Sequence, residues 1–202
     1  MSKKYDVAIV GATGAVGETL ISILDQRNFP INNLYPLASK RSAGSKVKCQ
    51  GKSWLVEDLD TFDFSKVQIG MFSAGGDISE KYVPVAASKG CIVIDNTSHF
   101  RRDKDIPLVI PEVNPHAIAN YTNRNIIANP NCSTIQMLVA LKPIYDAVGI
   151  DRINVATYQA VSGSGKEAIT ELTNQTANLL NGKDVEVEVY TKQIALNAIH
   201  NI

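Results

Sequence analysis

The sequence predicts an α/β protein that is built on a doubly wound parallel sheet. Short apolar runs, rich in β-branched residues, recur along the first 130 residues. Such continuous runs are typical of strands that are buried on both faces of a parallel sheet. Helical patterns alternate with them, and the connection between the first strand and the first helix is rich in glycine. Strands and helices that alternate in this way favour a parallel sheet covered by helices.

Composition excludes several classes of protein. A chain of 202 residues can bury a sizeable core. Lys and Arg together number 20, as do Asp and Glu, so nothing in the charge points to nucleic acid or an anionic membrane as a partner. No apolar run approaches the roughly 18 residues of a membrane span, and the N-terminus has no signal-peptide core. Cys49, Cys91 and Cys132 fit a reducing cytoplasm and indicate neither a disulfide framework nor a metal site.

The first strand leads directly into a glycine-rich turn. Val7-Ala8-Ile9-Val10 is followed by Gly11, Gly14 and Gly17, and then by a helix. The apolar face of that helix is predicted to comprise Val16, Leu20, Ile23 and Leu24. In a Rossmann-type turn the glycines let the backbone approach a pyrophosphate, and the helix N-terminus supplies N–H donors. The pattern predicts a dinucleotide site; the alternative is a glycine turn that only allows close packing.

The second strand, residues 33–38, favours NADP over NAD. An NAD site usually places an acid here, roughly 20 residues after the glycines, to bind the ribose 2′-hydroxyl. No acid is present, and the strand runs into Ser39-Lys40-Arg41-Ser42. Hydroxyls and cations suit a 2′-phosphate. The alternative is a solvated basic loop.

The next elements extend the sheet. Residues 46–48 and 53–56 alternate around Gly51 and are predicted to form an antiparallel excursion. Residues 67–72 are predicted to be a buried strand that ends in a small-residue turn at the edge where cofactors bind. A helix is expected over 78–88, with Pro84 inside it, and then a strand over 91–94, with Cys91 in the core.

A polar loop leaves the sheet at residues 95–102. Its adjacent Arg101 and Arg102 could hold an anion, since guanidinium groups bind phosphate and carboxylate in bidentate fashion. The alternative is that one or both arginines are simply solvated. After a proline-bounded extended stretch the chain reaches another apolar run, residues 125–128. We expect the nucleotide-binding domain to span residues 1–130 and the next domain to begin at 131.

Cys132 lies at a predicted strand-to-helix turn. Pro130 ends the strand, Asn131 is a plausible helix cap, and a helical pattern begins at Ile135. Cys132 therefore falls at or near the first helical position, where unpaired N–H groups and the helix dipole favour the thiolate nucleophile. The alternative is a small buried hydrophobe.

The last quarter is predicted to continue as a long strand, residues 151–161, and a helix over about 166–180. The turn between them, Ser162-Gly163-Ser164-Gly165-Lys166, resembles part of a phosphate loop. Glu167 follows Lys166 where such a loop needs Ser or Thr, so a nucleoside triphosphatase is not expected. Residues 185–190 then alternate Val and Glu.

Taken together, these motifs resemble those of the aspartate-semialdehyde dehydrogenase family. They occur in the family's order and cover the whole chain. The matching segments are Gly11-Ala-Thr-Gly-Ala-Val-Gly17, Ser39-Lys-Arg-Ser-Ala-Gly44, Phe100-Arg101, Pro111-Glu-Val-Asn114, Pro130-Asn-Cys-Ser-Thr134 and Tyr158-Gln-Ala-Val-Ser-Gly163.

The resemblance implies an NADP-dependent enzyme that interconverts aspartate 4-semialdehyde plus phosphate with 4-aspartyl phosphate, in the biosynthesis of lysine (through diaminopimelate), threonine and methionine. It implies that Cys132 is the acyl-thioester nucleophile and that Gln159 orients the bound acyl group. It also implies that Arg101, which directly follows Phe100, binds phosphate. The implied cofactor-binding residues are Gly11, Thr13, Gly14, Ala15, Val16, Arg41, Ser42, Ser162 and Gly163.

The family has further sequence beyond the position that matches Ile202. That part carries the general-base histidine and basic substrate-binding residues, and it completes the second domain and the homodimer interface. None of His99, His116 and His200 stands in the catalytic-histidine context. The resemblance therefore implies that residues 131–202 begin an incomplete α+β catalytic and dimerisation domain.

Two other functional hypotheses stay open. One is an N-acetyl-glutamyl-phosphate reductase, although its cysteine normally follows glycine and Cys132 follows Asn131. The other is an inactive, truncated NADP-binding remnant, because an incomplete domain exposes strand edges and apolar surface. For the isolated 202-residue chain we expect low solubility and no turnover.

Overall fold

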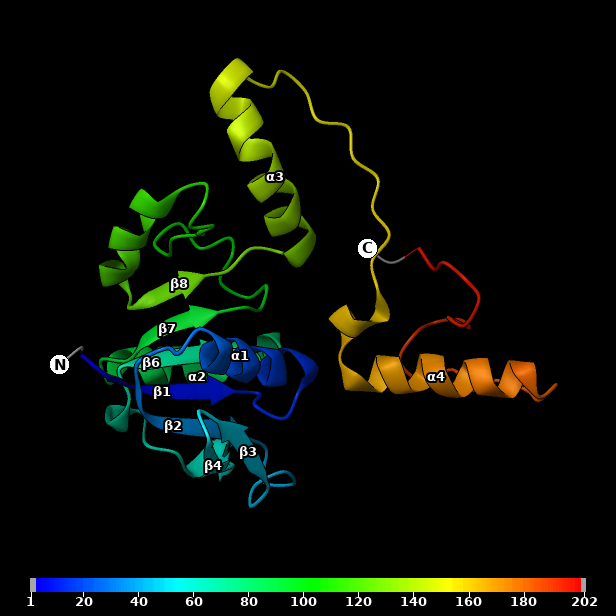
Figure 1. The fold of residues 1–202 in the computed structure, drawn as a ribbon, viewed down its shortest axis with the longest axis horizontal. Coiled ribbons are helices and arrows are strands. Elements are labelled where there is room, and N and C mark those ends of the chain that lie inside the picture. The colour runs from blue at the N-terminus through cyan, green and yellow to red at the C-terminus, as the bar shows by residue number, and fades with distance from the viewer. Residues whose placement is uncertain (1–2, 201–202) are drawn as a thin grey trace. The chain divides into compact units, whose positions relative to one another are not determined.

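Six parallel strands form the central sheet, in the order β5-β2-β1-β6-β7-β8. Figure 1 shows this order from β2 to β8. Their bounds are β1 Tyr5–Val10, β2 Ile31–Ala38, β5 Glu57–Asp58, β6 Ile69–Phe72, β7 Ile92–Asp95 and β8 Ile126–Ala128. The strand order reverses between β1 and β6, and in open α/β sheets ligands bind outside the carboxyl ends of the strands at such a point. The predicted doubly wound sheet is confirmed.

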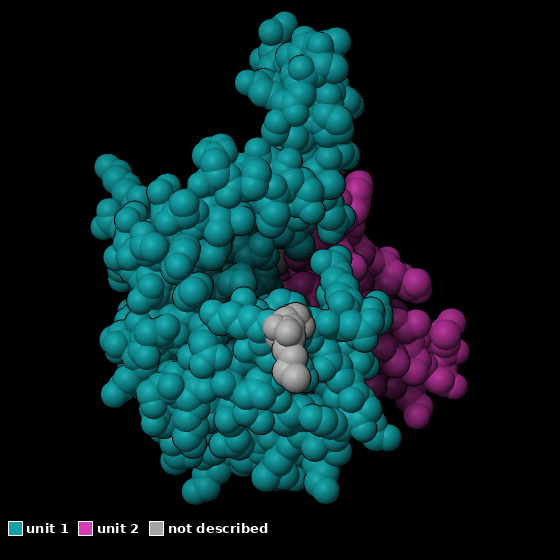
Figure 2. Space-filling model, turned by 60° about the vertical axis from the view of Figure 1, so that its left-hand side comes forward, with its two compact units in different colours: residues 1–153 teal, residues 154–202 magenta. Residues whose placement is uncertain are grey.

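The computed structural model describes residues 3–200. The chain divides into two compact units, residues 1–153 and 154–202, which Figure 2 distinguishes by colour. The sheet belongs entirely to the first unit.

Helices cover both faces of the sheet. On one face α1 (Ala15–Gln26) packs with Val7 and Ile9, together with the β3–β4 hairpin, Lys46–Cys49 and Lys52–Leu55. On the other face α2 (Gly76–Ser88) packs with Ala8 and Val10. Alternate residues of β1 thus enter opposite layers of the core, which explains why the run is apolar without interruption. The hairpin turns at Gln50 and Gly51, both with positive φ, so the predicted antiparallel excursion is confirmed.

The buried stripe of α1 differs from the predicted one. Gly17, Ile21 and Leu24 are buried, whereas Val16 and Ile23 are 41% and 37% exposed. The helix must approach the sheet through Gly17, because a Cβ atom there would lie 2.1 Å from the Gly11 carbonyl oxygen. The stripe therefore runs from Gly17 at helical spacing, and Val16 and Ile23 fall outside it.

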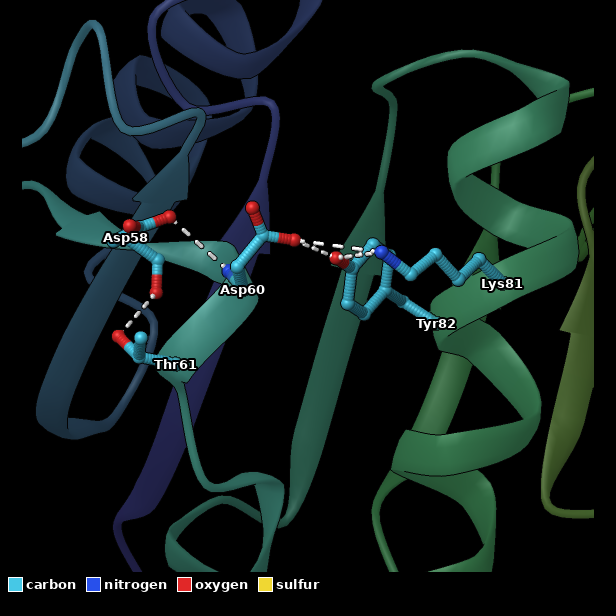
Figure 3. Close-up of polar contacts among 5 residues, drawn as sticks. All are labelled: Asp58, Asp60, Thr61, Lys81 and Tyr82. Carbon is cyan, nitrogen blue, oxygen red and sulfur yellow. Dashed lines mark hydrogen bonds and ion pairs between the residues drawn. The ribbon is translucent and has the colours of Figure 1, made fainter.

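A polar cluster links the end of edge strand β5 to α2 (Figure 3). The Tyr82 hydroxyl donates a hydrogen bond to Asp60, and Lys81 Nζ lies 2.7 Å from the Tyr82 hydroxyl and 3.5 Å from Asp60 Oδ1. The Asp58 carboxylate accepts the Asp60 N–H at 3.1 Å and caps the short helix η1, Leu59–Thr61. The Tyr82 hydrogen bond, with Lys81, lowers the pKa of Asp60. Because the ion pair is exposed, it contributes little stability.

The remainder of the first unit leads to α3. Two further short helices, η2 (Phe64–Lys66) and η3 (Pro115–Asn123), precede β6 and β8 respectively. Helix α3, Cys132–Val148, is separated from β8 by three residues and has no buried residue. In the described part of the chain no helix is long and apolar enough to cross a membrane.

The second unit consists of η4 (Val161–Ser164), α4 (Lys166–Leu180) and irregular segments. The bounds predicted for α4 are confirmed. The long strand predicted over 151–161 is wrong: residues 151–160 have no regular structure and their side chains are exposed. A strand needs a neighbour to pair its backbone groups, and no described strand pairs with this segment. Alternation in the sequence alone could not supply that partner.

Side chains of α4 form hydrogen bonds with the main chain of the segment that follows the helix, in place of the bonds that a neighbouring strand would supply. Buried Gln175 donates to the Glu186 carbonyl at 2.6 Å and accepts from the N–H groups of Ile194 and Ala195 at 2.9 and 3.1 Å. Buried Glu171 accepts from Gln175 at 2.9 Å and from the Val189 N–H. The segment from 186 to 195 is therefore held without strand pairing.

Candidate active site

The predicted functional loops of the first unit lie at one edge of the sheet. Gly11–Gly14 follows β1, the basic loop 39–44 follows β2, and the turn 73–75 follows β6. The loop carrying Arg101 follows β7, and the turn before Cys132 follows β8. Because all six strands are parallel, their carboxyl ends meet at the same edge, so residues far apart in sequence come together there.

Close packing fixes the glycine turn. Gly11 has φ of +87°, and a Cβ atom there would lie 3.1 Å from the Ser73 carbonyl. The N–H groups of Gly11 and Ala12 donate to the Leu37 carbonyl of β2 at 2.9 and 3.1 Å. Glycine at position 11 is required by its backbone conformation, and glycine at position 17 by its contact with the Gly11 oxygen.

The N-terminus of α1 can accept an anion. The helix starts at Ala15, Gly14 occupies the cap position, and no side chain caps it. The first N–H groups of a helix have no partner within the helix, so here they can donate to a phosphate. Thr13 and Val16 flank this start, at the strand-order reversal where a dinucleotide is expected.

The loop after β2 is folded on itself. The Ser39 carbonyl accepts the N–H groups of Ser42 and Ala43 at 2.8 and 3.2 Å. The Arg41 side chain is exposed and Ser42 is half-buried. The neighbouring edge strand β5 carries Asp58, but that carboxylate caps η1. The end of β2 itself thus offers a cation and a hydroxyl and no carboxylate.

Cys132 occupies the position that the sequence predicts for it. It is the first residue of α3 and is exposed. The Asn131 side chain caps the helix, since its Oδ1 accepts the Ser133 N–H at 3.0 Å and the Ser133 hydroxyl. The cap leaves the thiol open to solvent at the positive end of the helix dipole.

The other two thiols are unsuited to nucleophilic chemistry. Cys49 and Cys91 are buried. Burial raises the pKa of Cys91 to about 12, and burial together with the Asp25 carboxylate raises the pKa of Cys49. Both thiols therefore stay protonated at neutral pH, and the thiolate is the nucleophilic form. The expectation that Cys91 is a core residue is confirmed.

Arg101 joins its own loop to the turn that precedes Cys132. Its Nε donates to the Asn129 carbonyl at 2.9 Å, and Nη2 donates to the Asn96 carbonyl at 3.1 Å. Arg101 is half-buried, whereas Arg102 is exposed. The structure thus distinguishes two arginines that spacing alone left equivalent and of which the family resemblance favoured Arg101. The His99 ring packs against Phe100, with centroids 4.6 Å apart, as part of the same loop.

Sequence reasoning missed three polar residues at this edge. Asn129 Nδ2 donates to Asn96 Oδ1 at 2.6 Å, which links the loops after β7 and β8. Asp95 is fully buried and accepts the Ser79 and Thr97 hydroxyls at 2.7 and 2.8 Å. An acid directly after an apolar strand was a visible signal for Asp95, because a buried charge needs partners. No local pattern in the sequence indicates the Asn96–Asn129 pair, since the two residues are 33 positions apart in the chain.

Three further predicted site residues belong to the second unit. Gln159, Ser162 and Gly163 lie in and just before η4. A Cβ atom on Gly163 would lie 2.4 Å from Gln159 Nε2, so the glycine makes room for the Gln159 amide. Gln159 also lines an open groove of about 620 Å³ within this unit, together with Ser164 and Tyr190.

Two family models match the chain. The semialdehyde dehydrogenase NAD-binding domain matches residues 6–121, and the semialdehyde dehydrogenase dimerisation domain matches residues 141–202. Aspartate-semialdehyde dehydrogenase from Shewanella sp. (strain DB6705) is 66% identical over 202 residues, and aspartate-semialdehyde dehydrogenase 2 from Vibrio cholerae is 61% identical. Each alignment covers 100% of this chain and 60% of the relative. The chain therefore spans about 60% of the length of these curated relatives.

Solved structures of aspartate semialdehyde dehydrogenases also match this chain. The crystal structure of aspartate semialdehyde dehydrogenase II from Vibrio cholerae, complexed with ASA, matches with a TM-score of 0.97 at 61% identity. The match covers 100% of this chain and 60% of that chain. The Candida albicans aspartate semialdehyde dehydrogenase, solved with NADP, matches with a TM-score of 0.59 at 25% identity over 73% of this chain and 48% of that one.

Proposed function

This chain belongs to the semialdehyde dehydrogenase family, and from that premise we propose that it is the nucleotide-binding and nucleophile-bearing part of an NADP-dependent aspartate-semialdehyde dehydrogenase. The reaction interconverts aspartate 4-semialdehyde, phosphate and NADP with 4-aspartyl phosphate, NADPH and a proton, in lysine, threonine and methionine biosynthesis. The observation that supports it most is the contact of Arg101 with the turn before Cys132. A phosphate-binding cation and a thiol nucleophile belong to adjacent strand ends of one sheet.

These residues account for the chemistry in the biosynthetic direction. The Cys132 thiolate attacks the acyl carbon of 4-aspartyl phosphate, a C–S bond forms, and the C–O bond to phosphate breaks. Arg101 binds the departing phosphate, and Gln159 orients the acyl group. N–H groups at the start of α3 stabilise the oxyanion. Bound NADPH supplies the hydride that reduces the thioester; the resulting thiohemiacetal expels the Cys132 thiolate and releases the aldehyde.

The domain division and assembly are part of the proposal. We place the nucleotide-binding domain at residues 1–130 and the start of the catalytic and dimerisation domain at 131–202, which the two family matches support. A homodimer fits the dimerisation-domain match and the exposed apolar side chains of α3, namely Val139, Ile144, Tyr145 and Val148. A cytoplasmic location fits the three free cysteines.

The function is tested with the complete gene product. NADPH formation is expected to require aspartate semialdehyde, NADP and phosphate together, because phosphate must release the acyl group from Cys132. The assay follows NADPH absorbance while each component is omitted in turn. NADPH formation that is unaffected by omitting phosphate would contradict the proposal. Turnover of N-acetyl-glutamate semialdehyde instead would favour the reductase alternative, which Asn131 before Cys132 disfavours.

The cofactor preference is tested at Arg41. We expect Arg41→Ala to lower kcat/KM for NADP by about 10- to 100-fold, because a hydrogen bond between charged groups contributes about 1.5–3 kcal/mol. With NAD, which lacks the 2′-phosphate, the change should be small. Steady-state kinetics with both cofactors measure the difference, and Lys48→Ala removes an exposed cation from β3 as a matched control. Equal losses with NADP and NAD would exclude a 2′-phosphate contact.

A further inference from the structure

We propose that Asn96 and Asn129 are positioning residues that hold the Arg101 guanidinium at a fixed place relative to the Cys132 turn. The inference rests on the proposed function, because it assigns the pair a task in binding the phosphate of that reaction. We call the three residues Asn96, Arg101 and Asn129 the clasp. The clasp is closed by one bond between side chains and by two bonds from Arg101 to main-chain carbonyls.

The carbonyls that receive Arg101 are themselves fixed by the sheet. The Asn96 N–H donates to the Phe72 carbonyl of β6 at 2.9 Å, and the Asn129 N–H donates to the Asp95 carbonyl of β7 at 2.8 Å. Each asparagine thus continues the hydrogen-bonding pattern of the sheet one residue past its strand. The side-chain bond of 2.6 Å then links the two residues whose carbonyls accept the hydrogen bonds from Arg101.

The start of the loop after β7 is anchored by the Asp95 carboxylate. This fully buried group accepts the Ser79 hydroxyl at 2.7 Å, the Thr97 hydroxyl at 2.8 Å and the Thr97 N–H at 3.2 Å. Ser79 belongs to α2, so the loop is attached to a second element of the core. Asn96 lies between these attachments and has little freedom to move its carbonyl.

The clasp orients Arg101 without neutralising its charge. A guanidinium group has five N–H donors, and two are used on neutral carbonyls, which leaves three for an anion. Among residues 3–200 no carboxylate forms an ion pair with Arg101. Arg124, by contrast, pairs with Asp103 at 3.3 Å. An oriented and unpaired guanidinium suits bidentate binding of phosphate.

A purely structural role for the asparagine bond predicts a different outcome from a positioning role. If the bond only satisfies two half-buried amides, its loss lowers thermal stability and leaves the balance between substrates unchanged. If it positions Arg101, its loss weakens the phosphate contact selectively, because a misplaced charged group forfeits its directional hydrogen bonds.

The test uses the complete gene product with Asn129→Ala, Asn96→Ala and the double variant. We expect each single variant to raise KM for phosphate about 5- to 10-fold, the equivalent of roughly 1 kcal/mol for one hydrogen bond, with a much smaller change in KM for aspartate semialdehyde. In the double variant, KM for phosphate should rise about as much as in the more affected single variant. The two effects should not add, since both substitutions remove the same bond. Asn33→Ala is the matched control. The Asn33 amide donates a hydrogen bond to Asp6 at 2.8 Å near the amino ends of β1 and β2, away from the strand ends that carry the candidate site.

Several outcomes overturn the inference. Unchanged KM for phosphate in both single variants would do so, as would additive losses in the double variant or the same effect in Asn33→Ala. If Asn129→Ala does not fold, Asn96→Ala tests the same bond from the other loop. A wild-type protein without phosphate-dependent activity would refute the proposed function instead. Calorimetric titration with inorganic phosphate then tests the clasp alone: binding that weakens in the variants supports it, and no binding by the wild type rejects it.

Discussion

Replacing Cys132 with alanine is expected to abolish turnover by the complete gene product, with kcat lowered by at least about 10⁴-fold. The thiol is exposed at the first position of α3, and without it no thioester can form. Binding of NADP should change little, because the glycine turn and the loop after β2 follow other strands. Kinetics of NADPH formation measure the loss, and fluorescence titration with NADP measures the retained affinity.

Cys91→Ala provides the control for this prediction. Cys91 is buried and burial raises its pKa to about 12, so its removal should lower stability without removing the nucleophile. In the wild-type protein a thiol-alkylating reagent should label Cys132 long before the two buried cysteines. Turnover by Cys132→Ala at a rate near that of the wild type would refute the assignment of the nucleophile.

The substitution Gly17→Ala is expected to disrupt the glycine turn. Its Cβ atom would lie 2.1 Å from the Gly11 carbonyl oxygen and 2.8 Å from Ala12 Cα, and both contacts are with backbone that cannot rotate away. We expect the free energy of unfolding to fall by about 3 kcal/mol or more, at or beyond the upper end for overpacked cores. The NADP affinity of any folded protein should fall by about 100-fold, because the helix N-terminus is displaced from the pyrophosphate.

Thermal denaturation and NADP titration check this second prediction. Gly76→Ala is the matched control for stability, since that glycine begins α2 and a Cβ atom there would meet nothing within 4 Å. Alanine in a helix is favoured over glycine, so this control should keep or raise the melting temperature. A Gly17→Ala protein with wild-type stability and NADP affinity would contradict the packing argument.

Several structural features of this protein could be predicted from the sequence alone, because they depend on local interactions. Continuous apolar runs identified the buried parallel strands, and the capping tendency of Asn131 placed Cys132 at the start of α3. Gly11 and Gly17 identified the dinucleotide turn, and the periodicity of residues 166–180 gave α4 with its observed bounds. Each of these features depends on interactions between residues that are close in sequence, so composition and spacing contain them.

Tertiary structure alone decided which residues meet across the sheet. Arg101 contacts Asn129, 28 residues away, and Asn96 bonds Asn129 only because β7 and β8 are neighbours in the strand order. The same dependence made the strand predicted over 151–161 wrong, since alternation describes a strand but does not provide its partner. Strand order sets these long-range contacts, and no local pattern encodes it. The sequence therefore predicted the glycine turn and the place of Cys132 at a helix start, whereas only the fold joined Arg101 to the turn before Cys132.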